Sequence, residues 1–118
     1  MRIVAGKHRG ARLVAPEGLE IRPTSERARE ALFSILEGGR FPLTLRGARV
    51  LDLFAGTGAL GLEALSRGAS QIVFVENGAV ALEALRSNIA KLRAAGMVHV
   101  RETDATRFLE RTTTPADL

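Results

Sequence analysis

Residues 50–65 read VLDLFAGTGALGLEAL and pass from an apolar, strand-like run through a glycine-rich turn into a helix-like run. The glycines follow the spacing Gly56-x-Gly58-x-x-Gly61, which is typical of a dinucleotide-binding turn between a strand and a helix. An acid, Asp52, precedes the first of these glycines by four residues. A carboxylate is unexpected there, because the negatively charged pyrophosphate of a dinucleotide lies beside the same turn.

Strand-like and helix-like runs alternate around this turn. Strands are predicted over residues 49–54, 71–75 and 97–102, and helices over 59–67, 79–95 and 105–111. The second strand is apolar on both faces, which indicates a buried parallel strand. Gly68 is predicted to stop the first of these helices and Gly96 to follow the cap of the second. This order predicts an α/β fold with right-handed crossovers, a Rossmann-like doubly wound parallel sheet.

Two earlier segments are predicted to precede this sheet. Residues 1–22 are predicted to form a basic β-hairpin, with extended runs over 2–6 and 11–16 around a glycine-containing turn. A helix is then predicted to begin near Thr24, its N-cap, and to end at Gly38-Gly39. The core face of that helix is expected to comprise Ala28, Ala31, Leu32, Ile35 and Leu36. The apolar side of the 79–95 helix is expected to comprise Val80, Leu82, Leu85, Ile89 and Leu92.

The composition excludes several kinds of site. The chain has 118 residues and no cysteine, so it holds at most one domain and neither disulfides nor thiolate metal sites. Its two histidines, His8 and His99, are isolated, and no metal site is predicted. No apolar run is long enough to span a membrane and the first ten residues lack a signal region, so a cytoplasmic protein is expected. The net charge of +4 permits a polyanionic partner.

Three acids, Asp52, Glu76 and Asp104, fall at the ends of successive predicted strands. Each alone is more often a helix cap or a solvated side chain, but open α/β sheets bind ligands where such strand ends meet. A dinucleotide would bring phosphates against Asp52, whereas S-adenosylmethionine brings a sulfonium and an ammonium, which a carboxylate attracts. The sequence therefore predicts S-adenosylmethionine as the cofactor, with Glu76 accepting the ribose hydroxyls and Asp104 the adenine amino group. The predicted cofactor contacts are Asp52, Phe54, Ala55, Gly56, Thr57, Gly58, Glu76, Asn77, Asp104 and Ala105.

Three motifs carry a family resemblance. They are AGKHRGARL at residues 5–13, RPTSERAREALF at 22–33, and LDLFAGTGALGLEALSRGA at 51–69 followed by VFVE at 73–76. In these motifs the chain resembles the bacterial 16S ribosomal RNA guanine-N2 methyltransferase family. The matches cover most of residues 5–76, and the second motif is the specific one, because many methyltransferases share the third. The resemblance implies methyl transfer from S-adenosylmethionine to the exocyclic amine of a guanine in small-subunit ribosomal RNA.

The resemblance also implies where this chain departs from its family. Relatives carry an Asp-Pro-Pro-Tyr or Asn-Pro-Pro-Tyr motif after the fourth strand, which positions the amine and stacks on the base. This chain has no such motif, and its final residues Ala116-Asp117-Leu118 look like the first step of that fourth strand. The chain is therefore interpreted as truncated, with catalytic residues unknown and negligible methyl transfer expected from it alone. Residues 23–118 are interpreted as the N-terminal part of the methyltransferase domain.

By the same resemblance, the basic N-terminal residues are expected to bind RNA. Lys7, Arg9 and Arg12 of the hairpin would contact phosphates, while Arg22 and Thr24 would sit over the cofactor or target pocket. The expected partner is 16S ribosomal RNA or the small ribosomal subunit, and the full-length protein is expected to be a monomer. The sequence leaves open which nucleotide is the target.

Rival functions remain open at the level of sequence. A methyltransferase for another nucleic-acid amine, such as adenine N6, would share the cofactor half. A nicotinamide-dependent oxidoreductase would bind NADH rather than S-adenosylhomocysteine at the glycine turn. A non-catalytic RNA-binding fragment is the third alternative.

Overall fold

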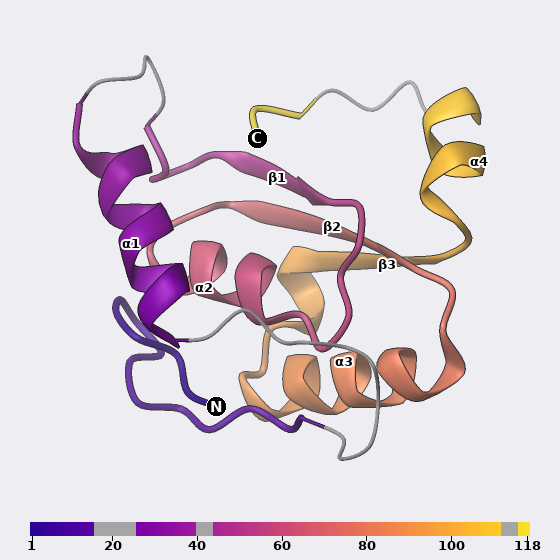
Figure 1. The fold of residues 1–118 in the computed structure, drawn as a ribbon, viewed down its shortest axis with the longest axis horizontal. Helices are drawn as coiled ribbons and strands as arrows, with labels where there is room; N and C mark the ends of the chain where they lie inside the picture. Colours follow the sequence, from indigo (N-terminus) through magenta and orange to yellow (C-terminus); the bar gives the residue numbers. More distant parts are fainter. Residues whose placement is uncertain (16–25, 40–43, 112–115) are drawn as a thin grey trace.

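A computed structural model describes residues 1–15, 26–39, 44–111 and 116–118 of the chain. Helices and strands alternate along it as predicted (Figure 1). The elements are α1 (Glu26–Glu37), β1 (Arg49–Asp52), α2 (Ala59–Ser66), β2 (Gln71–Glu76), α3 (Ala79–Lys91), the short 3₁₀ helix η1 (Ala95–Met97), β3 (Val98–Glu102) and α4 (Ala105–Arg111). None of the helices in these ranges is long and apolar enough to cross a membrane.

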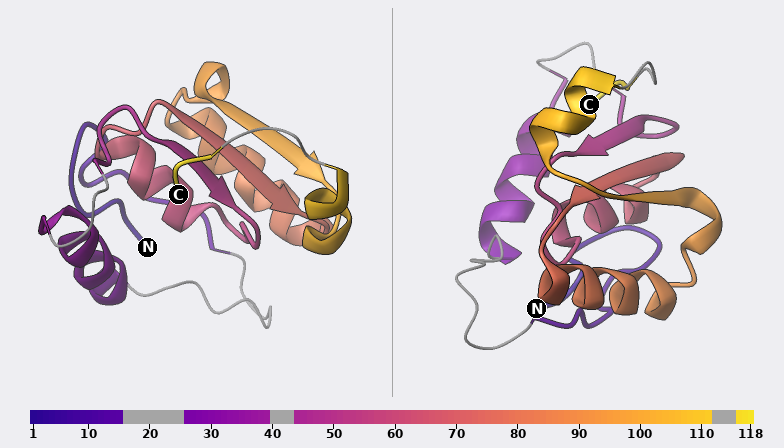
Figure 2. Two further views of the ribbon diagram at one scale, coloured as in Figure 1. Left: turned by 90° about the horizontal axis from the view of Figure 1, so that it is seen from above. Right: turned by 90° about the vertical axis from the view of Figure 1, so that its right-hand side faces the viewer.

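The described residues form a three-stranded parallel sheet in the order β1-β2-β3. Helices α2 and α3 lie on one face of this sheet and α4 lies on the other, as the right-hand view of Figure 2 shows. The central strand β2 is the buried parallel strand that was predicted, since Ile72, Phe74 and Val75 are all fully buried. The α/β fold with a Rossmann-like parallel sheet is therefore confirmed.

Gly61 allows α2 to approach β2 closely. A Cβ atom built at this position would lie 2.8 Å from Cζ of Phe74 and 3.0 Å from Cγ2 of Ile72. Both distances are shorter than van der Waals contact, so only glycine lets the helix backbone rest on these two strand side chains. The close packing of α2 on β2 therefore depends on the third glycine of the motif.

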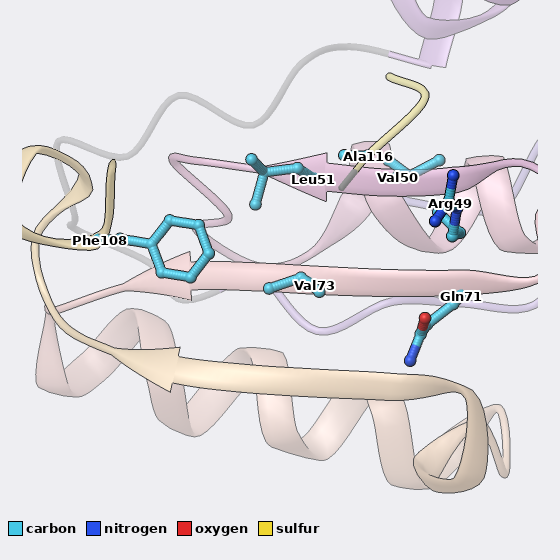
Figure 3. Close-up of a pocket in the computed structure, with 7 residues that line it drawn as sticks. All are labelled: Arg49, Val50, Leu51, Gln71, Val73, Phe108 and Ala116. Carbon is cyan, nitrogen blue, oxygen red and sulfur yellow. The ribbon is translucent and has the colours of Figure 1, made fainter. Parts of the chain in front are cut away.

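Residues 116–118 lie along the free edge of β1 (Figure 1). Leu118 donates its N–H to the carbonyl of Arg49 at 3.2 Å and accepts the N–H of Leu51 at 2.7 Å, the slanted alternation of a parallel pair. The expectation that these residues start a fourth strand agrees with this pairing. A small cavity on the sheet face that carries α4 is lined by Arg49, Val50, Leu51, Gln71, Val73, Phe108 and Ala116 (Figure 3).

The N-terminal hairpin is only partly formed. Residues 1–15 make one isolated antiparallel bridge between Arg2 and Arg12, supported by the bond from the N–H of Ile3 to the carbonyl of Ala11 at 2.9 Å. The segment does not extend into a ribbon, because several of its other N–H groups bond to side chains of α2 and α3 instead. The boundary between residues 22 and 23 stays a prediction, since residues 16–25 lie outside the described ranges.

The predicted core face of α1 is wrong. Leu32 and Ile35 are 41% and 56% exposed, whereas Arg29 and Phe33 are the buried residues of this helix. Ala28 and Ala31 are also exposed, and Leu36 alone of the predicted face packs against the core. The helix is rotated because Arg29 pairs with the buried Glu63 and the Phe33 ring lies 4.8 Å beneath the Arg67 guanidinium.

Two predictions about α3 are also wrong. Val80 is 48% exposed, and the helix ends at Lys91 rather than at residue 95. Its terminus is a Schellman motif, in which Arg93 donates to the carbonyl of Ala90 and Ala94 to that of Ile89, both at 3.0 Å. The left-handed position of this motif is occupied by Arg93, at φ +53°, and not by Gly96. The corresponding stop at Gly68 after α2, at φ +117°, is confirmed.

Candidate functional site

The glycine-rich turn joins the carboxyl end of β1 to the start of α2. Its N–H groups are tied inward, with Ala55 donating to the carbonyl of Val75 at 3.1 Å and Gly58 to that of Ala55 at 2.8 Å. Gly56 and Gly58 have positive φ angles of +55° and +87°. A Cβ atom at Gly58 would also lie 2.5 Å from Cδ1 of Leu85. The turn can therefore keep this shape only with glycine at that position.

Glu76 closes the turn from the neighbouring strand. One carboxylate oxygen accepts the N–H of Gly56 at 2.8 Å, and the other accepts those of Asn77 at 3.1 Å and Gly78 at 2.9 Å. A carboxylate offers about four lone-pair positions, so acceptor capacity remains after these three bonds. The structure thus brings the second strand-end acid into direct contact with the first glycine of the motif.

Asp52 lies at the end of β1 beside this turn and is partly buried. Burial raises the pKa of Asp52, the negative charge of Glu76 adds to the rise, and hydrogen bonds from the backbone of Phe54 and Gly61 oppose it. Its Oδ2 atom is buried and has no hydrogen-bond partner among the described residues. A buried carboxylate oxygen without a partner is unfavourable alone and favours a bound cation or donor.

The other predicted cofactor residues surround these acids. Phe54 is 82% exposed at the edge of the turn, and Asn77 is also exposed. Ala55 and Thr57 are buried within the turn. Asp104 caps α4 by accepting the N–H of Arg107 at 2.7 Å, and Ala105 is the first residue of that helix. Asp104 therefore has a helix-capping role, and a second role toward a ligand stays a prediction.

The predicted RNA-binding residues are not brought to this turn. Lys7, Arg9 and Arg12 are exposed on the N-terminal segment. The N–H of Lys7 bonds to the carbonyl of Ser66 at 2.7 Å. Residues 6–10, here called the basic turn, therefore contact the C-terminal end of α2, which lies away from the glycine-rich turn. Arg22 and Thr24 lie outside the described residues. Within the described ranges, no group of three or more His, Asp or Glu side chains could hold a metal ion.

Two buried polar residues were missed by the sequence analysis. Glu63 accepts the N–H groups of Val4 at 2.9 Å and Ala5 at 3.1 Å, in addition to its pairs with two arginines. Asn88 bonds to both backbone groups of Val14 and donates to the carbonyl of Thr57 at 2.9 Å. Asn88 thus links the N-terminal segment to the glycine-rich turn. An isolated acid inside the apolar run ALGLEALS was the available signal for Glu63.

A family model described as Conserved hypothetical protein 95 matches residues 1–118. The chain belongs to this family. It is 40% identical over its full length to Ribosomal RNA small subunit methyltransferase D of Escherichia coli K12, and it spans 57% of the length of that relative. The family resemblance inferred from the three motifs is therefore confirmed.

Solved structures agree with this family fold. The Escherichia coli protein yhhF superposes with a TM-score of 0.83 at 37% identity, over 99% of this chain and 60% of that one. Precorrin-6Y C5,15-methyltransferase of Geobacter metallireducens gives a TM-score of 0.68 at 22% identity, over 87% of this chain and 50% of that one. At that identity the second likeness shows a shared Rossmann-like fold and nothing further.

Proposed function

We propose that the protein is a cytoplasmic methyltransferase that uses S-adenosylmethionine to methylate the exocyclic N2 of a guanine in 16S ribosomal RNA. The observation that carries this proposal is the buried carboxylate oxygen of Asp52 beside the glycine turn, which has no hydrogen-bond partner in the part of the chain that the structure describes. A dinucleotide would place phosphates against Asp52, whereas the sulfonium and ammonium of S-adenosylmethionine are attracted by this carboxylate. The name of the Escherichia coli relative supports a ribosomal RNA substrate.

The residues at the carboxyl ends of the strands fit such a cofactor. The methyl group to be transferred would be supplied by S-adenosylmethionine held there. Asp52 would face its positive charges, the remaining acceptor capacity of Glu76 would receive ribose hydroxyls, and Asp104 would receive the adenine amino group. Phe54, Asn77, Ala105 and the backbone of residues 55–58 would line the same crevice. We assign no catalytic residue, because the chain contains no Asp-Pro-Pro-Tyr or Asn-Pro-Pro-Tyr motif.

Glu76→Ala is expected to weaken binding of S-adenosylhomocysteine by about 1–3 kcal/mol, because the ribose would lose a charged acceptor. The glycine turn would also lose the bond to Gly56, so Glu76→Gln, which keeps one carbonyl oxygen for that bond, is measured beside it. Isothermal titration calorimetry gives the affinity of both variants, and thermal melting reports whether the turn survives.

The matched control is Glu102→Ala. Glu102 pairs with Glu76 in the register of β2 and β3, lies at the same edge of the sheet and is exposed, where it pairs with Arg86. Its removal changes the net charge equally and is expected to leave cofactor affinity unchanged. Equal affinity in Glu76→Ala and the unaltered protein would remove Glu76 from the site. Saturable binding of NADH with none of S-adenosylhomocysteine would contradict the proposed class of enzyme.

Combined replacement of Arg9→Ala and Arg12→Ala is expected to weaken binding to 16S ribosomal RNA and to flatten its salt dependence. Each lost phosphate contact lowers the slope of log affinity against log salt by about 0.7–0.9. Filter binding at salt concentrations between about 50 and 200 mM measures this slope. Cofactor affinity serves as the internal control and should stay constant. RNA binding that is indifferent to both replacements would exclude the N-terminal turn from the interface.

A further inference from the structure

Unpaired positive charge lies at the end of the sheet that is formed by the amino ends of the parallel strands, opposite the end that carries the glycine turn. Five exposed cations, here called the basic edge, are found there, and none has an ion pair within the described part of the chain. They are Lys7, Arg9, Arg46, Lys91 and Arg93. The three C-terminal members of this set were not among the predicted RNA-binding residues, so the structure extends the candidate surface well beyond the N-terminal segment.

The positions of these residues follow from the chain topology. Helices α2 and α3 each run back from the end of one parallel strand to the start of the next, so both helices end at the same edge (Figure 1). Lys7 is held at the end of α2 by Ser66, and Gly47 donates to the carbonyl of Gly68 at 2.8 Å, which places Arg46 beside the same helix end. Lys91 and Arg93 occupy the end of α3.

Charge is segregated between the two edges of the sheet. Asp52, Glu76, Glu102 and Asp104 all lie at the carboxyl ends of the strands. Residues 1–15 and 84–97, which supply most of the basic edge, contain no acid at all. Near the end of α2, Glu63 and Glu37 are both engaged by Arg67, at 2.9 and 3.0 Å. A polyanion is therefore attracted to the basic edge and repelled by the glycine-turn edge.

The left-handed backbone conformation of Arg93 is a second, independent indication that its side chain has a role. Both α2 and α3 end in a Schellman motif, and α2 uses Gly68 at the left-handed position. At the equivalent position α3 has Arg93, at φ +53°, although a side chain in this conformation is strained by about 1–2 kcal/mol. Strained residues of this kind cluster at functional sites. Arg93 is exposed and has no ion pair among the described residues, so its guanidinium is available to a ligand.

We propose that the basic edge binds the phosphate backbone of RNA and that Arg46, Lys91 and Arg93 are part of this contact. The inference rests on the proposed function, because the RNA is the substrate proposed above. The eight residues of α2 separate this edge from the glycine turn, a length of about 12 Å. The substrate RNA is thus held along one edge of the sheet while the target nucleotide reaches the opposite one.

Arg93→Gly tests the inference with two readouts that move in opposite directions. Glycine relieves the positive φ, so the melting temperature is expected to rise. Loss of the guanidinium is expected to weaken binding of 16S ribosomal RNA about five-fold and to lower its salt slope by about 0.7–0.9. Arg46→Ala and Lys91→Ala are expected to lower RNA affinity to a similar extent, with cofactor affinity unchanged. A general loss of folding cannot produce a more stable protein that binds RNA less tightly.

Arg101→Ala is the matched control. Arg101 is exposed on β3, opposite Val75, and has no ion pair within the described ranges, so the same charge is removed outside the basic edge. At physiological ionic strength screening extends about 8 Å, and RNA affinity is expected to stay constant. The inference would be overturned, and the proposed substrate kept, if RNA affinity were unchanged in Arg93→Gly, Arg46→Ala and Lys91→Ala while replacement of Arg9 and Arg12 still lowered it. Absence of RNA binding by the unaltered protein would overturn the proposed substrate as well.

Discussion

Replacement of Glu63 by alanine is expected to remove about 3–5 kcal/mol from the free energy of unfolding, because it leaves a buried charge without its partner. The side chains of Glu63 and Arg29 are both fully buried, with Oε1 of the acid 3.4 Å from Nη1 of the arginine. Glu63 also accepts two N–H groups of the N-terminal segment, from Val4 and Ala5. Urea-induced unfolding, followed by circular dichroism, measures the loss.

A double variant separates the buried charge from simple loss of packing. Glu63→Leu combined with Arg29→Met removes both charges and keeps most of the side-chain volume, and is expected to be less destabilising than Glu63→Ala because no buried charge is left unpaired. The N–H groups of Val4 and Ala5 lose their acceptor in both proteins, so the difference between them reports the unpaired Arg29. Arg67 loses its pair with Glu63 and retains its pair with Glu37 in both proteins, so this loss is common to the two variants. A single variant as stable as the double one would contradict the view that the ion pair holds α1 and the N-terminal segment on α2.

The sheet could be predicted from sequence because each of its strands and helices is specified by residues that are close together in the chain. Each strand in the described part of the chain is followed by a helix that carries its own hydrophobic period. The glycine spacing fixes the first crossover through two short-range requirements, a positive φ at Gly58 and close packing at Gly61. The burial of β2 on both faces follows directly from its uninterrupted apolar run. These features need no knowledge of distant contacts.

The failure at α1 comes from compensation by a distant partner, whereas the failure at the end of α3 is a local one, in which a residue other than glycine takes the left-handed conformation. Hydrophobic periodicity assigned Leu32 and Ile35 to the core, yet Arg29 takes the inner face because Glu63, 34 residues away, neutralises it. Glycine preference assigned the end of α3 to Gly96, yet Arg93 adopts the left-handed conformation three residues earlier. A single sequence without knowledge of the partner cannot distinguish a buried arginine from a solvated one.

The positions of the candidate site residues were predicted from the sequence, but their hydrogen bonds were not. Asp52 and Glu76 were placed at adjacent strand ends by topology alone. The structure adds that Glu76 is itself part of the glycine turn, through its bond to Gly56, and that one oxygen of Asp52 lacks a partner among the described residues. The position of the basic turn at the far end of α2 could not be predicted, because it depends on bonds from Lys7 and His8 to Ser66.

Gly6→Ala is expected to detach this basic turn from α2. Gly6 has φ +87°, and a Cβ atom there would overlap the backbone carbonyl of Ser66 and approach the nitrogen of Arg67 to 2.9 Å. Left-handed strain costs about 1–2 kcal/mol and an overpacked contact about 1–3 kcal/mol more, because a helix backbone cannot move aside as a side chain can. Urea unfolding measures the loss. RNA affinity should fall with it, since Lys7 and Arg9 are carried by the same turn.

Gly10→Ala is the control for this replacement, because Gly10 has nearly the same φ, +84°, and a Cβ atom there meets nothing within 4 Å. It carries the strain without the collision, so a loss of no more than about 1–2 kcal/mol is expected. The difference between the two variants therefore isolates the contact with Ser66, through which the N-terminal segment is docked on the end of α2. Equal destabilisation by both replacements would mean that the backbone at Ser66 moves aside at little cost. The basic turn would then be held in place mainly by the hydrogen bonds of the N-terminal segment to Glu63 and Asn88.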